Sequence, residues 1–546
     1  MALSAAASTL ARLGYYEKLA GILGIIGLVL LFWQRTRQPF YPDLPLAGET
    51  PHRRWFSLRT RFRYYTDCAS LFNEAYHTVR FHASTSSSST LSRLNAHASQ
   101  YTKHGKGVLL PSVGVHTAVV MPESALDWAM SQPDSALSIT HAFADLNQTR
   151  YSLGDARYWR DPWQLTLVKA HLAAVTPALV PQLNDELADA LAKRLGTDTD
   201  SWREMELETT LRRVVAQTLS RLIVGPELCR DEGYLDLAYK VVLGVMTTIF
   251  ATLPYPDLVR AVTGPLASWH TQRRISRIQR HLEPLYRERL AILRSAKEDQ
   301  PPDLLMAMMR FAQKKRPEEL ADPAIIARRV CAANFVAMHQ TTIVLTNIIL
   351  HVLGSDAEFS TIAALRSEAA AHLLSSERIT KDAFAQMKVA DSVAREATRL
   401  NFPLGGRASP RTVMRDGLVS PEGIRLQRGT TVSWLAGCAQ LDPEAFPEPR
   451  RFDPFRFSRG DGDGEGERDT FVKTSARYLP WGHGKHACPG RFVVDYVVKM
   501  ALAQLVTKYD LAWPEDYGGK QPPSVWLAEL SVPPPRARIM VRRRKV

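Results

Sequence analysis

The chain has 546 residues, a formal net charge of +14, 45% hydrophobic residues and 23% charged residues. This composition excludes a disordered chain, and the length allows one large domain or two to three ordinary ones. Five dispersed cysteines without a C-x-x-C pair exclude a disulfide framework or a zinc cluster and fit a reducing compartment. No nucleic-acid-binding motif accompanies the positive charge, which therefore indicates a solvated surface or contact with an acidic partner or anionic lipid.

The N-terminal segment 1–38 is predicted to be a transmembrane anchor. An uninterrupted apolar run over 19–33 is followed by Arg35 and Arg37. With the apolar residues before it, this run reaches the roughly 20 residues that span a bilayer, and its basic flank marks the cytoplasmic side. The alternative, a cleaved signal peptide, carries its basic residues before the apolar run. We expect a single-pass protein in which a proline-rich hinge over 39–59 leads to a cytoplasmic domain.

Residues 60–546 are predicted to form one mainly helical domain with a smaller β-rich region. Helical periodicity dominates from about 155 to 400, and strand and turn patterns return over 403–460. Pro177, Pro181 and Pro284 are expected to kink or split two of the helices. The expected helices are 164–194, 207–224, 233–250, 267–297, 324–353, 358–374 and 383–399.

The helix expected over 324–353 has Asp322 as its N-cap and Pro323 in its first turn. Polar groups inside a buried helix need hydrogen-bond partners or a function. The sequence therefore predicts either polar side chains that are satisfied within the helix or a functional site at its centre. The polar residues concerned are Asn334, His339, Gln340, Thr341, Thr342, Thr346 and Asn347.

A glycine-rich loop before the last long helix carries the most specific signal. Residues 481–492 read WGHGKHACPGRF, and an apolar helical stretch follows. Glycine lets the backbone approach a flat molecule closely, and the N–H groups at a helix start stabilise a thiolate at Cys488. Such a thiolate in a dry pocket suits axial ligation of haem iron, with His486 in reach of a propionate. The alternative is a buried structural cysteine in a turn.

This loop resembles the haem-binding loop of the cytochrome P-450 superfamily. Its fixed positions are filled by Trp481, Gly482, Gly484, His486, Cys488 and Gly490. A Glu-x-x-Arg helix and a later Pro/Phe/Arg segment, also typical of the superfamily, correspond to 396–399 and 449–457. The resemblance implies that Glu396, Arg399 and Arg456 form a buried charge-assisted network that fixes the loop holding Cys488.

The long helix departs from the superfamily pattern of a small residue, any residue, an acid and a threonine. Aligned on Ala337 and Met338, the acid falls on His339 and the threonine on Gln340. A shift by one residue places the threonine at Thr341 instead. A histidine at the acid position resembles fungal secondary-metabolism members, whereas an amide can hold a water but is a poor proton donor. The sequence leaves open which of His339, Gln340 and Thr341 relays protons.

Further cofactor contacts are implied by the same resemblance. The segments 161–187 and 216–234 resemble fungal haem-thiolate enzymes of natural-product pathways, although the expected Trp-x-x-x-Arg is not met cleanly. Lys169 and His171 are the candidate propionate partners there, and Arg407 or Arg411 is a candidate for a second propionate contact.

Trp481 occupies a position where the superfamily usually has phenylalanine. Its indole carries an N–H donor that phenyl lacks. If this N–H points at the Cys488 sulfur, it drains charge from the thiolate and raises the iron potential. The alternative is that the indole merely packs on the porphyrin.

The resemblance implies a haem b monooxygenase of the cytochrome P-450 fold in the endoplasmic reticulum membrane. Its partners would be an NADPH-cytochrome reductase, with cytochrome b5 as a second donor, and a hydrophobic substrate of fungal secondary metabolism such as a terpenoid, polyketide or alkaloid. The segment 131–160 is expected to line the distal pocket. Because of Gln340, radical coupling or isomerisation/dehydration without net oxygen insertion is the alternative. A non-catalytic haem-binding or scaffold protein is the third possibility.

Overall fold

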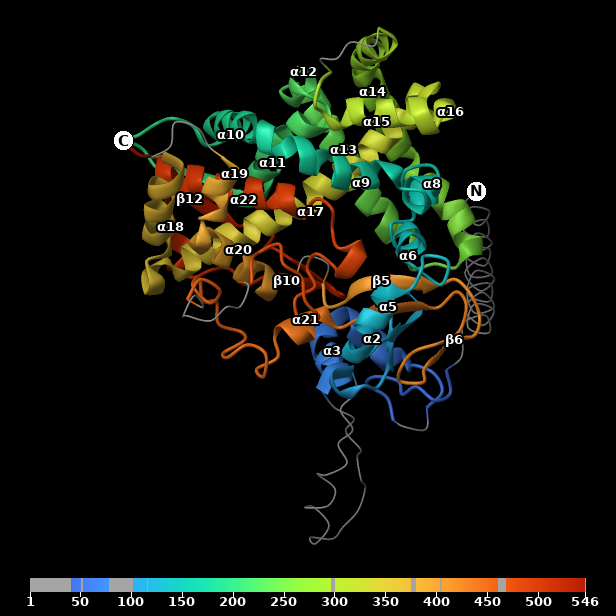
Figure 1. Ribbon diagram of the computed structural model, residues 1–546. Helices are drawn as coiled ribbons and strands as arrows, with labels where there is room; N and C mark the ends of the chain where they lie inside the picture. Colours follow the sequence, from blue (N-terminus) through green and yellow to red (C-terminus); the bar gives the residue numbers. More distant parts are fainter. Residues whose placement is uncertain are drawn as a thin grey trace, which may run out of the picture.

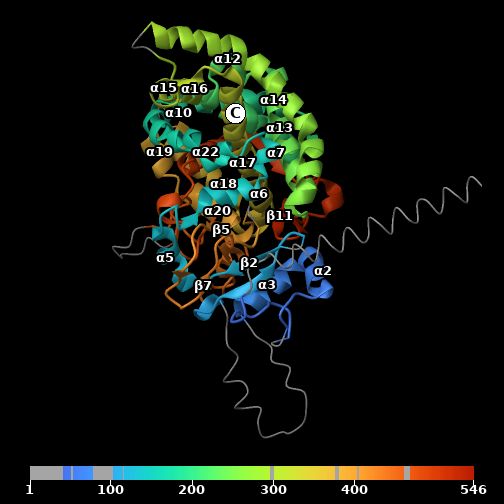
Figure 2. The ribbon, with the colours of Figure 1, turned by 90° about the vertical axis from the view of Figure 1, so that its right-hand side faces the viewer.

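A computed structural model describes residues 41–50, 53–77, 102–114, 116–295, 300–374, 380–402, 405–459 and 468–545. A large helical region lies beside a smaller region of short strands (Figure 1). Figure 2 shows the same two regions from the side, with the strands and the first helices at the lower end. This architecture confirms the mainly helical fold class predicted from the sequence.

The predicted anchor over 1–38 lies outside the described residues. Within the described ranges, two helices are long and apolar enough to cross a membrane, Glu232–Thr252 and Pro323–Phe359. Half of the apolar window of the first and 72% of that of the second are buried inside the protein. Both are therefore explained as core helices of the fold.

Helix α17 (Pro323–Phe359) is the central element of the helical region. It begins as predicted, because the Asp322 side chain accepts a hydrogen bond from the Ala324 N–H at 2.9 Å and Pro323 occupies the first turn. It continues beyond the predicted end to Phe359 and stops at Ser360, whose φ is +52°. The helices that pack against it include α11 (Leu207–Ile223), α13 (Glu232–Thr252), α14 (Asp257–Arg294) and α20 (Lys388–Leu400).

The remaining helices follow the predicted order with three differences. The stretch predicted as 383–399 is two helices, because the chain turns between them at Gln386 and Met387. Helix α14 begins ten residues before the predicted start and stays helical through Pro265 and Pro284. The stretch predicted as 164–194 is helical throughout but includes the π-helical turn η4 (Val168–Leu172). The other helices are α2 (Leu58–Thr66), α3 (Cys68–His77), α5 (Leu126–Ser131), α6 (Ile139–Leu146), α7 (Thr149–Ser152), α8 (Arg157–Arg160), α9 (Trp163–Leu167), α10 (Ala173–Leu195), α12 (Pro226–Cys229), α15 (Leu304–Lys315), α16 (Pro317–Leu320), α18 (Thr361–Ala369), α19 (Lys381–Ala385), α21 (Ala436–Gln440) and α22 (Arg491–Lys508), with the single turns η2 (Thr102–His104), η3 (Glu123–Ala125), η5 (Ala370–Leu374), η6 (Gly484–His486) and η7 (Glu515–Tyr517).

The largest sheet of the described chain has the strand order β1-β2-β8-β5-β3. All its neighbours are antiparallel except β2 and β8, which pair in parallel with Val119 opposite Val432. The pairing of β5 with β8 shifts register between Ala408 and Arg411. The five strands are β1 (Val108–Pro111), β2 (Thr117–Val120), β3 (Leu137–Ser138), β5 (Ala408–Val413) and β8 (Thr431–Trp434), and the smaller sheets contain β4 (Arg203–Glu206), β6 (Leu418–Val419), β7 (Arg425–Leu426), β9 (Tyr509–Ala512), β10 (Val525–Leu527), β11 (Leu530–Val532) and β12 (Arg538–Arg543).

Helix α22 fixes the position of the glycine-rich loop. It packs against α10, α18 and α20, and it buries Val497, Val498, Met500 and Ala501 almost completely. Burial of four such side chains contributes several kcal/mol to holding the helix in place. The loop that ends at Gly490 is thereby attached to a rigid core helix.

Candidate active site

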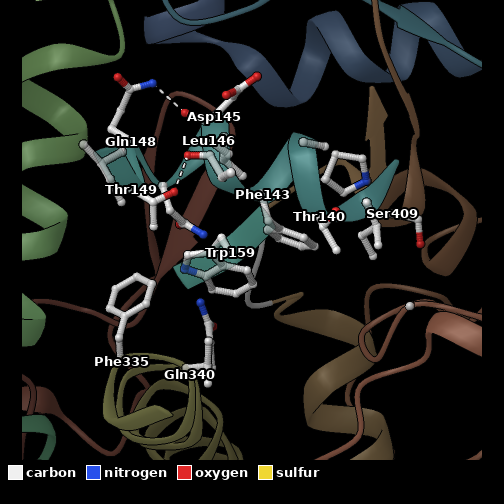
Figure 3. Close-up of a pocket in the computed structure, with 18 of the residues that line it drawn as sticks. Thr140, Phe143, Asp145, Leu146, Gln148, Thr149, Trp159, Phe335, Gln340 and Ser409 are labelled. Atoms are coloured by element: carbon white, nitrogen blue, oxygen red, sulfur yellow. Dashed lines mark hydrogen bonds between the residues drawn. The ribbon is translucent and has the colours of Figure 1, made fainter. Parts of the chain in front are cut away.

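A cavity of about 1800 Å³ lies between the middle of α17, the loop before α22, and helices α6, α9 and η4. Its wall is mainly apolar, and Figure 3 shows part of it. Pockets for drug-sized ligands usually measure about 300–1,000 Å³, so this one holds more than one such molecule. The space suits a large flat cofactor together with a substrate.

The predicted cysteine loop forms one wall of this cavity. The Cys488 N–H donates to the Trp481 carbonyl at 2.6 Å, which closes the loop on itself. Gly482 and Gly484 have φ of +69° and +62°, in the left-handed region that glycine adopts without strain. These two glycines are therefore required by the backbone of the loop.

Cys488 lines the cavity just before α22 and is half-buried. Burial raises its pKa, while the N–H groups of Gly490 and Arg491 lower it by favouring the thiolate. The N–H groups at the start of the helix thus lower the pKa of Cys488, as the sequence predicts, but burial raises this pKa by more. A coordinating cation deprotonates a thiol outright, so a metal beside the sulfur would produce the thiolate.

Trp481 lines the cavity, but its indole N–H donates to the Phe471 carbonyl at 2.7 Å. The prediction that this N–H points at the Cys488 sulfur is therefore wrong. The indole also packs edge-on against the Phe471 ring, with centroids 5.2 Å apart. The sequence of the loop alone does not predict that Phe471 lies beside it.

The structure brings Glu396, Arg399 and Arg456 together, as the resemblance implies. The Glu396 carboxylate accepts from Arg399 Nε at 2.7 Å and Nη2 at 2.8 Å, and from Arg456 Nε at 2.9 Å. Neither Glu396 nor Arg399 exposes its side chain to solvent. Each charge is therefore compensated by a partner inside the protein, as a buried charge requires.

Gln440, at the end of α21, links this network to the cysteine loop. The Arg399 Nη1 donates to the Gln440 carbonyl at 2.6 Å, and the Gln440 Nε2 donates back to the Arg399 carbonyl at 2.9 Å. The Gln440 Oε1 in turn accepts from the N–H of Leu479, two residues before Trp481. Sequence reasoning missed this residue, because nothing in its local pattern marks it as a bridge.

Three basic side chains line the cavity: Lys169, Lys485 and His486. The Lys485 Nζ donates to the carbonyls of Ser131 and Gln132, at 3.2 and 3.0 Å. The positive charge of Arg411 acts on His486 and helps to lower its pKa. The His486 Nε2 is buried without a hydrogen-bond partner among the described residues, and burial lowers its pKa. This cluster fits a ligand that carries carboxylates. Lys485 was not among the predicted cofactor contacts.

The other three candidates for propionate contacts hydrogen-bond to groups of the protein itself. Arg411 donates to the carbonyls of Ser409 and Pro410, and its burial lowers its pKa to about 10. Arg407 is paired with Glu529, with Nη2 and Oε1 2.8 Å apart. The His171 Nε2 lies 3.4 Å from the Pro302 carbonyl, and His171 is not among the residues that line the cavity.

His339, Gln340 and Thr341 all line the cavity from α17. Burial lowers the pKa of His339 to about 4, so this imidazole is neutral at pH 7. The Gln340 Oε1 is buried and has no hydrogen-bond partner among the described residues.

Two threonines of α17 are satisfied inside the protein. Thr342 donates to the Met338 carbonyl and Thr346 to the Thr342 carbonyl, both at 2.8 Å. Asn334 is partly satisfied: its Nδ2 donates to the Tyr234 hydroxyl at 3.1 Å, and its Oδ1 has no hydrogen-bond partner among the described residues. The threonines are therefore explained by hydrogen bonds within the helix. A functional site at the centre of the helix concerns the side chains that face the cavity.

The residues present fit a haem. The Cys488 thiol on the cavity wall would ligate the iron, the glycines would leave room for a flat ring, and the basic cluster would bind two propionates. The cavity also leaves space for a substrate.

Comparison with known proteins agrees with this assignment. The cytochrome P450 family model matches residues 159–541. The chain is 61% identical to the cytochrome P450 monooxygenase tenB of Beauveria bassiana (strain ARSEF 2860), with 100% of each chain covered. It is 40% identical to the cytochrome P450 monooxygenase pbrC of Penicillium brasilianum, with 97% of each covered.

A solved structure shows the same fold. The retinoic acid bound cyanobacterial CYP120A1 matches with a TM-score of 0.57 and 17% identity, over 79% of this chain and 90% of that one. The fold, the cysteine loop and the full-length relatives agree, and the chain belongs to the cytochrome P450 family of monooxygenases.

Proposed function

We propose that the protein is a membrane-bound haem-thiolate monooxygenase that oxidises a hydrophobic small molecule in fungal secondary metabolism. The observation that carries this proposal is the placement of Cys488 and the polar centre of α17 on one large, mainly apolar cavity. The full-length relatives from Beauveria and Penicillium, which are named monooxygenases, support it.

In this proposal, Cys488 ligates the iron of haem b, and Lys169, Lys485 and His486 bind the propionates with Arg411 behind them. Gly482, Gly484 and Gly490 leave room for the ring beside Trp481. When bound, a thiolate-ligated haem supplies the activation of dioxygen for oxidation of the substrate. The network of Glu396, Arg399 and Arg456 holds the cysteine loop in place.

Proton delivery is assigned to the polar side chains of α17. A neutral His339 accepts or passes a proton but holds no extra one at pH 7. The Thr341 hydroxyl both donates and accepts, whereas the Gln340 amide only positions a water or a substrate group. We therefore assign the relay to Thr341, with His339 beside it, and the apolar wall excludes other water from the site.

The membrane attachment is proposed from the N-terminal sequence and from one exposed apolar surface. Leu258, Val262 and Leu266 form a stripe on α14 with 62%, 65% and 73% of their area exposed, and Leu58 and Phe62 of α2 are exposed to 86% and 68%. Both helices lie next to the segment around Gly114. On α2, Arg61 donates to the Gly114 carbonyl at 3.1 Å, and Gly114 lies against Pro254, just before α14.

Such apolar stripes favour contact with a bilayer. We therefore propose the endoplasmic reticulum as the location, with 1–38 as a single-pass anchor, 39–59 as a hinge and 60–546 as the cytoplasmic catalytic domain. The electron donor in this arrangement is an NADPH-cytochrome reductase, and cytochrome b5 is a second donor.

Isotope-labelled dioxygen tests the proposed reaction. Microsomes that contain the full chain and an NADPH-cytochrome reductase are incubated with a set of hydrophobic fungal metabolites. We expect a product that gains one labelled oxygen atom only when NADPH, dioxygen and the reductase are all present. A product formed without the label would instead support the second candidate, radical coupling or isomerisation/dehydration, which the unusual Gln340 favours.

A further inference from the structure

Several buried polar atoms on the cavity wall have no hydrogen-bond partner among the described residues. Two of them belong to side chains that point toward one another in Figure 3: the Gln340 Oε1, an acceptor, and the Trp159 Nε1, a donor. Both atoms are buried, and Trp159 as a whole exposes only 8% of its surface. An unpaired buried polar atom costs about 1–3 kcal/mol, so a ligand that pairs both atoms recovers this free energy on binding.

The two side chains come from different elements and meet across the cavity. Gln340 projects from the middle of α17, and Trp159 from α8; in Figure 3 the carboxamide points toward the indole. Phe143 stacks on the Trp159 ring with centroids 5.5 Å apart, and Phe335 lies beside Gln340 in the same view. The polar pair is thus surrounded by aromatic faces.

We propose that Gln340 and Trp159 together recognise one polar group of the substrate, which carries a hydrogen-bond donor and an acceptor side by side on a flat body. Lactams, whose ring holds the amide cis, and hydroxyls next to a carbonyl have this pattern. The Gln340 Oε1 accepts from the donor of the substrate, and the Trp159 N–H donates to its carbonyl. This inference rests on the proposed function, because it concerns the substrate of that same site.

The pattern of charges supports a neutral polar group. Among the described charged residues that line the cavity, the basic cluster of Lys169, Lys485 and His486 is already assigned to the propionates. Arg160, beside Trp159 in the sequence, is paired with Asp145 at 3.4 Å. His339, next to Gln340 in the sequence, is neutral at pH 7. The substrate group at Gln340 and Trp159 is therefore expected to be uncharged, and hydrogen bonds rather than ion pairs select it.

The opposing interpretation is that Gln340 and Trp159 satisfy each other. A half-turn of the Gln340 carboxamide about its last side-chain bond exchanges its oxygen and nitrogen and turns the oxygen toward the indole N–H in Figure 3. In that arrangement a substrate donor gains nothing at Gln340. The two interpretations predict different affinities for ligands that differ only in one N–H.

Calorimetric titration with a matched pair of ligands decides between them. The probes are 4-phenylquinolin-2(1H)-one, a flat aromatic lactam, and its N-methyl derivative, which keeps the carbonyl but lacks the donor. With the haem-loaded full chain we expect roughly tenfold tighter binding of the N–H lactam, equivalent to about 1.4 kcal/mol. Equal affinity for both probes, or no binding of either, would overturn the proposal.

Three variants locate the effect. Gln340→Met keeps the side-chain length without an acceptor and is expected to abolish the preference for the N–H lactam. Trp159→Phe keeps the ring and is expected to weaken both lactams equally, because both carry the carbonyl. Met246→Leu, on the same cavity wall, is the matched control and is expected to keep the preference; a loss there would count against the assignment.

The readout separates this proposal from the proposed function. Calorimetry measures binding without turnover, and a carbon monoxide difference spectrum of each sample shows whether the haem-thiolate centre is intact. Loss of the lactam preference with an intact spectrum is attributed to the polar pair. An altered spectrum in the unsubstituted protein would instead contradict the haem assignment.

Discussion

Glu396 and Arg399 form a two-point ion pair, at 2.7 and 2.8 Å, in which neither side chain is exposed to solvent. Removing one partner of a buried pair leaves the other uncompensated and costs about 3–5 kcal/mol. Glu396→Gln removes one charge of the pair, and Arg399→Lys keeps the charge but loses the two-point contact. Both variants are therefore expected to lose most of their haem, measured as the ratio of haem to protein after purification. Arg451→Ala breaks only exposed pairs, with Glu358 and Glu448, and serves as the control. Full haem content in the first two variants would contradict this role.

Gln440 is expected to connect the network of Glu396 and Arg399 to the cysteine loop and so to hold the loop in place. Gln440→Met removes the hydrogen bonds to the Arg399 carbonyl and the Leu479 N–H while keeping the side-chain volume. Because these groups are buried, we expect a loss of stability of about 1–3 kcal/mol and faster haem loss. The rate of haem transfer to apomyoglobin measures the second effect. An unchanged rate would show that the loop does not depend on this bridge.

Trp481→Phe tests the bond that the structure assigns to the indole. The substitution removes the donor to the Phe471 carbonyl, which lies 2.7 Å away. We expect a destabilisation of about 1–2 kcal/mol in chemical denaturation and no shift in the reduction potential of the haem, since the N–H does not reach the sulfur. A clear change in potential with unchanged stability would support the earlier sequence-based expectation instead.

His339 gives the stability a pH dependence of defined sign. Its folded pKa of about 4 lies below its ordinary value of 6.5, so the unfolded chain binds a proton that the folded protein does not. The stabilising contribution is present above pH 6.5 and is lost as the pH falls toward 4, by at most about 1.4 kcal/mol per pH unit. In His339→Asn, the midpoint of urea denaturation is expected to fall less steeply over this range. Identical pH profiles would contradict the burial of a neutral imidazole.

Lys169 and Lys485 are expected to hold the propionate end of the haem. Lys169→Met and Lys485→Met each remove a positive charge from the cavity wall, so haem affinity should fall several-fold while the carbon monoxide spectrum keeps its band position. Lys240→Met, on the outer face of α13, is the control. Equal haem dissociation rates in all three variants would exclude this binding mode.

The fold could be predicted because its signals are local, whereas the contact of Glu396 with Arg456, 60 residues later, was implied by the resemblance of their two motifs to the superfamily. A capped apolar helix, a Glu-x-x-Arg turn and a glycine-rich cysteine loop each depend on residues close together in the sequence. The predicted helix ends were less accurate where a single residue determines them. An example is Ser360, whose left-handed conformation no sequence pattern predicts.

The contacts that the sequence did not predict join distant segments. The Trp481 N–H could be assigned a partner only when Phe471 was placed beside it, and Gln440 became a bridge only through the packing of α21 against α20. Likewise, Trp159 gained a role only once α8 lay across the cavity from Gln340. Side-chain direction across a tertiary contact is set by packing, which a single sequence does not encode locally.

The central claim is that Cys488 is the thiolate ligand of a haem iron, and the carbon monoxide difference spectrum of the dithionite-reduced protein tests it most directly. The account predicts a strongly red-shifted Soret band in microsomes that contain the full chain, and loss of that band in Cys488→Ala. Absence of the band in folded, haem-loaded protein, or its persistence in the variant, would contradict the assignment of the ligand and the function built on it.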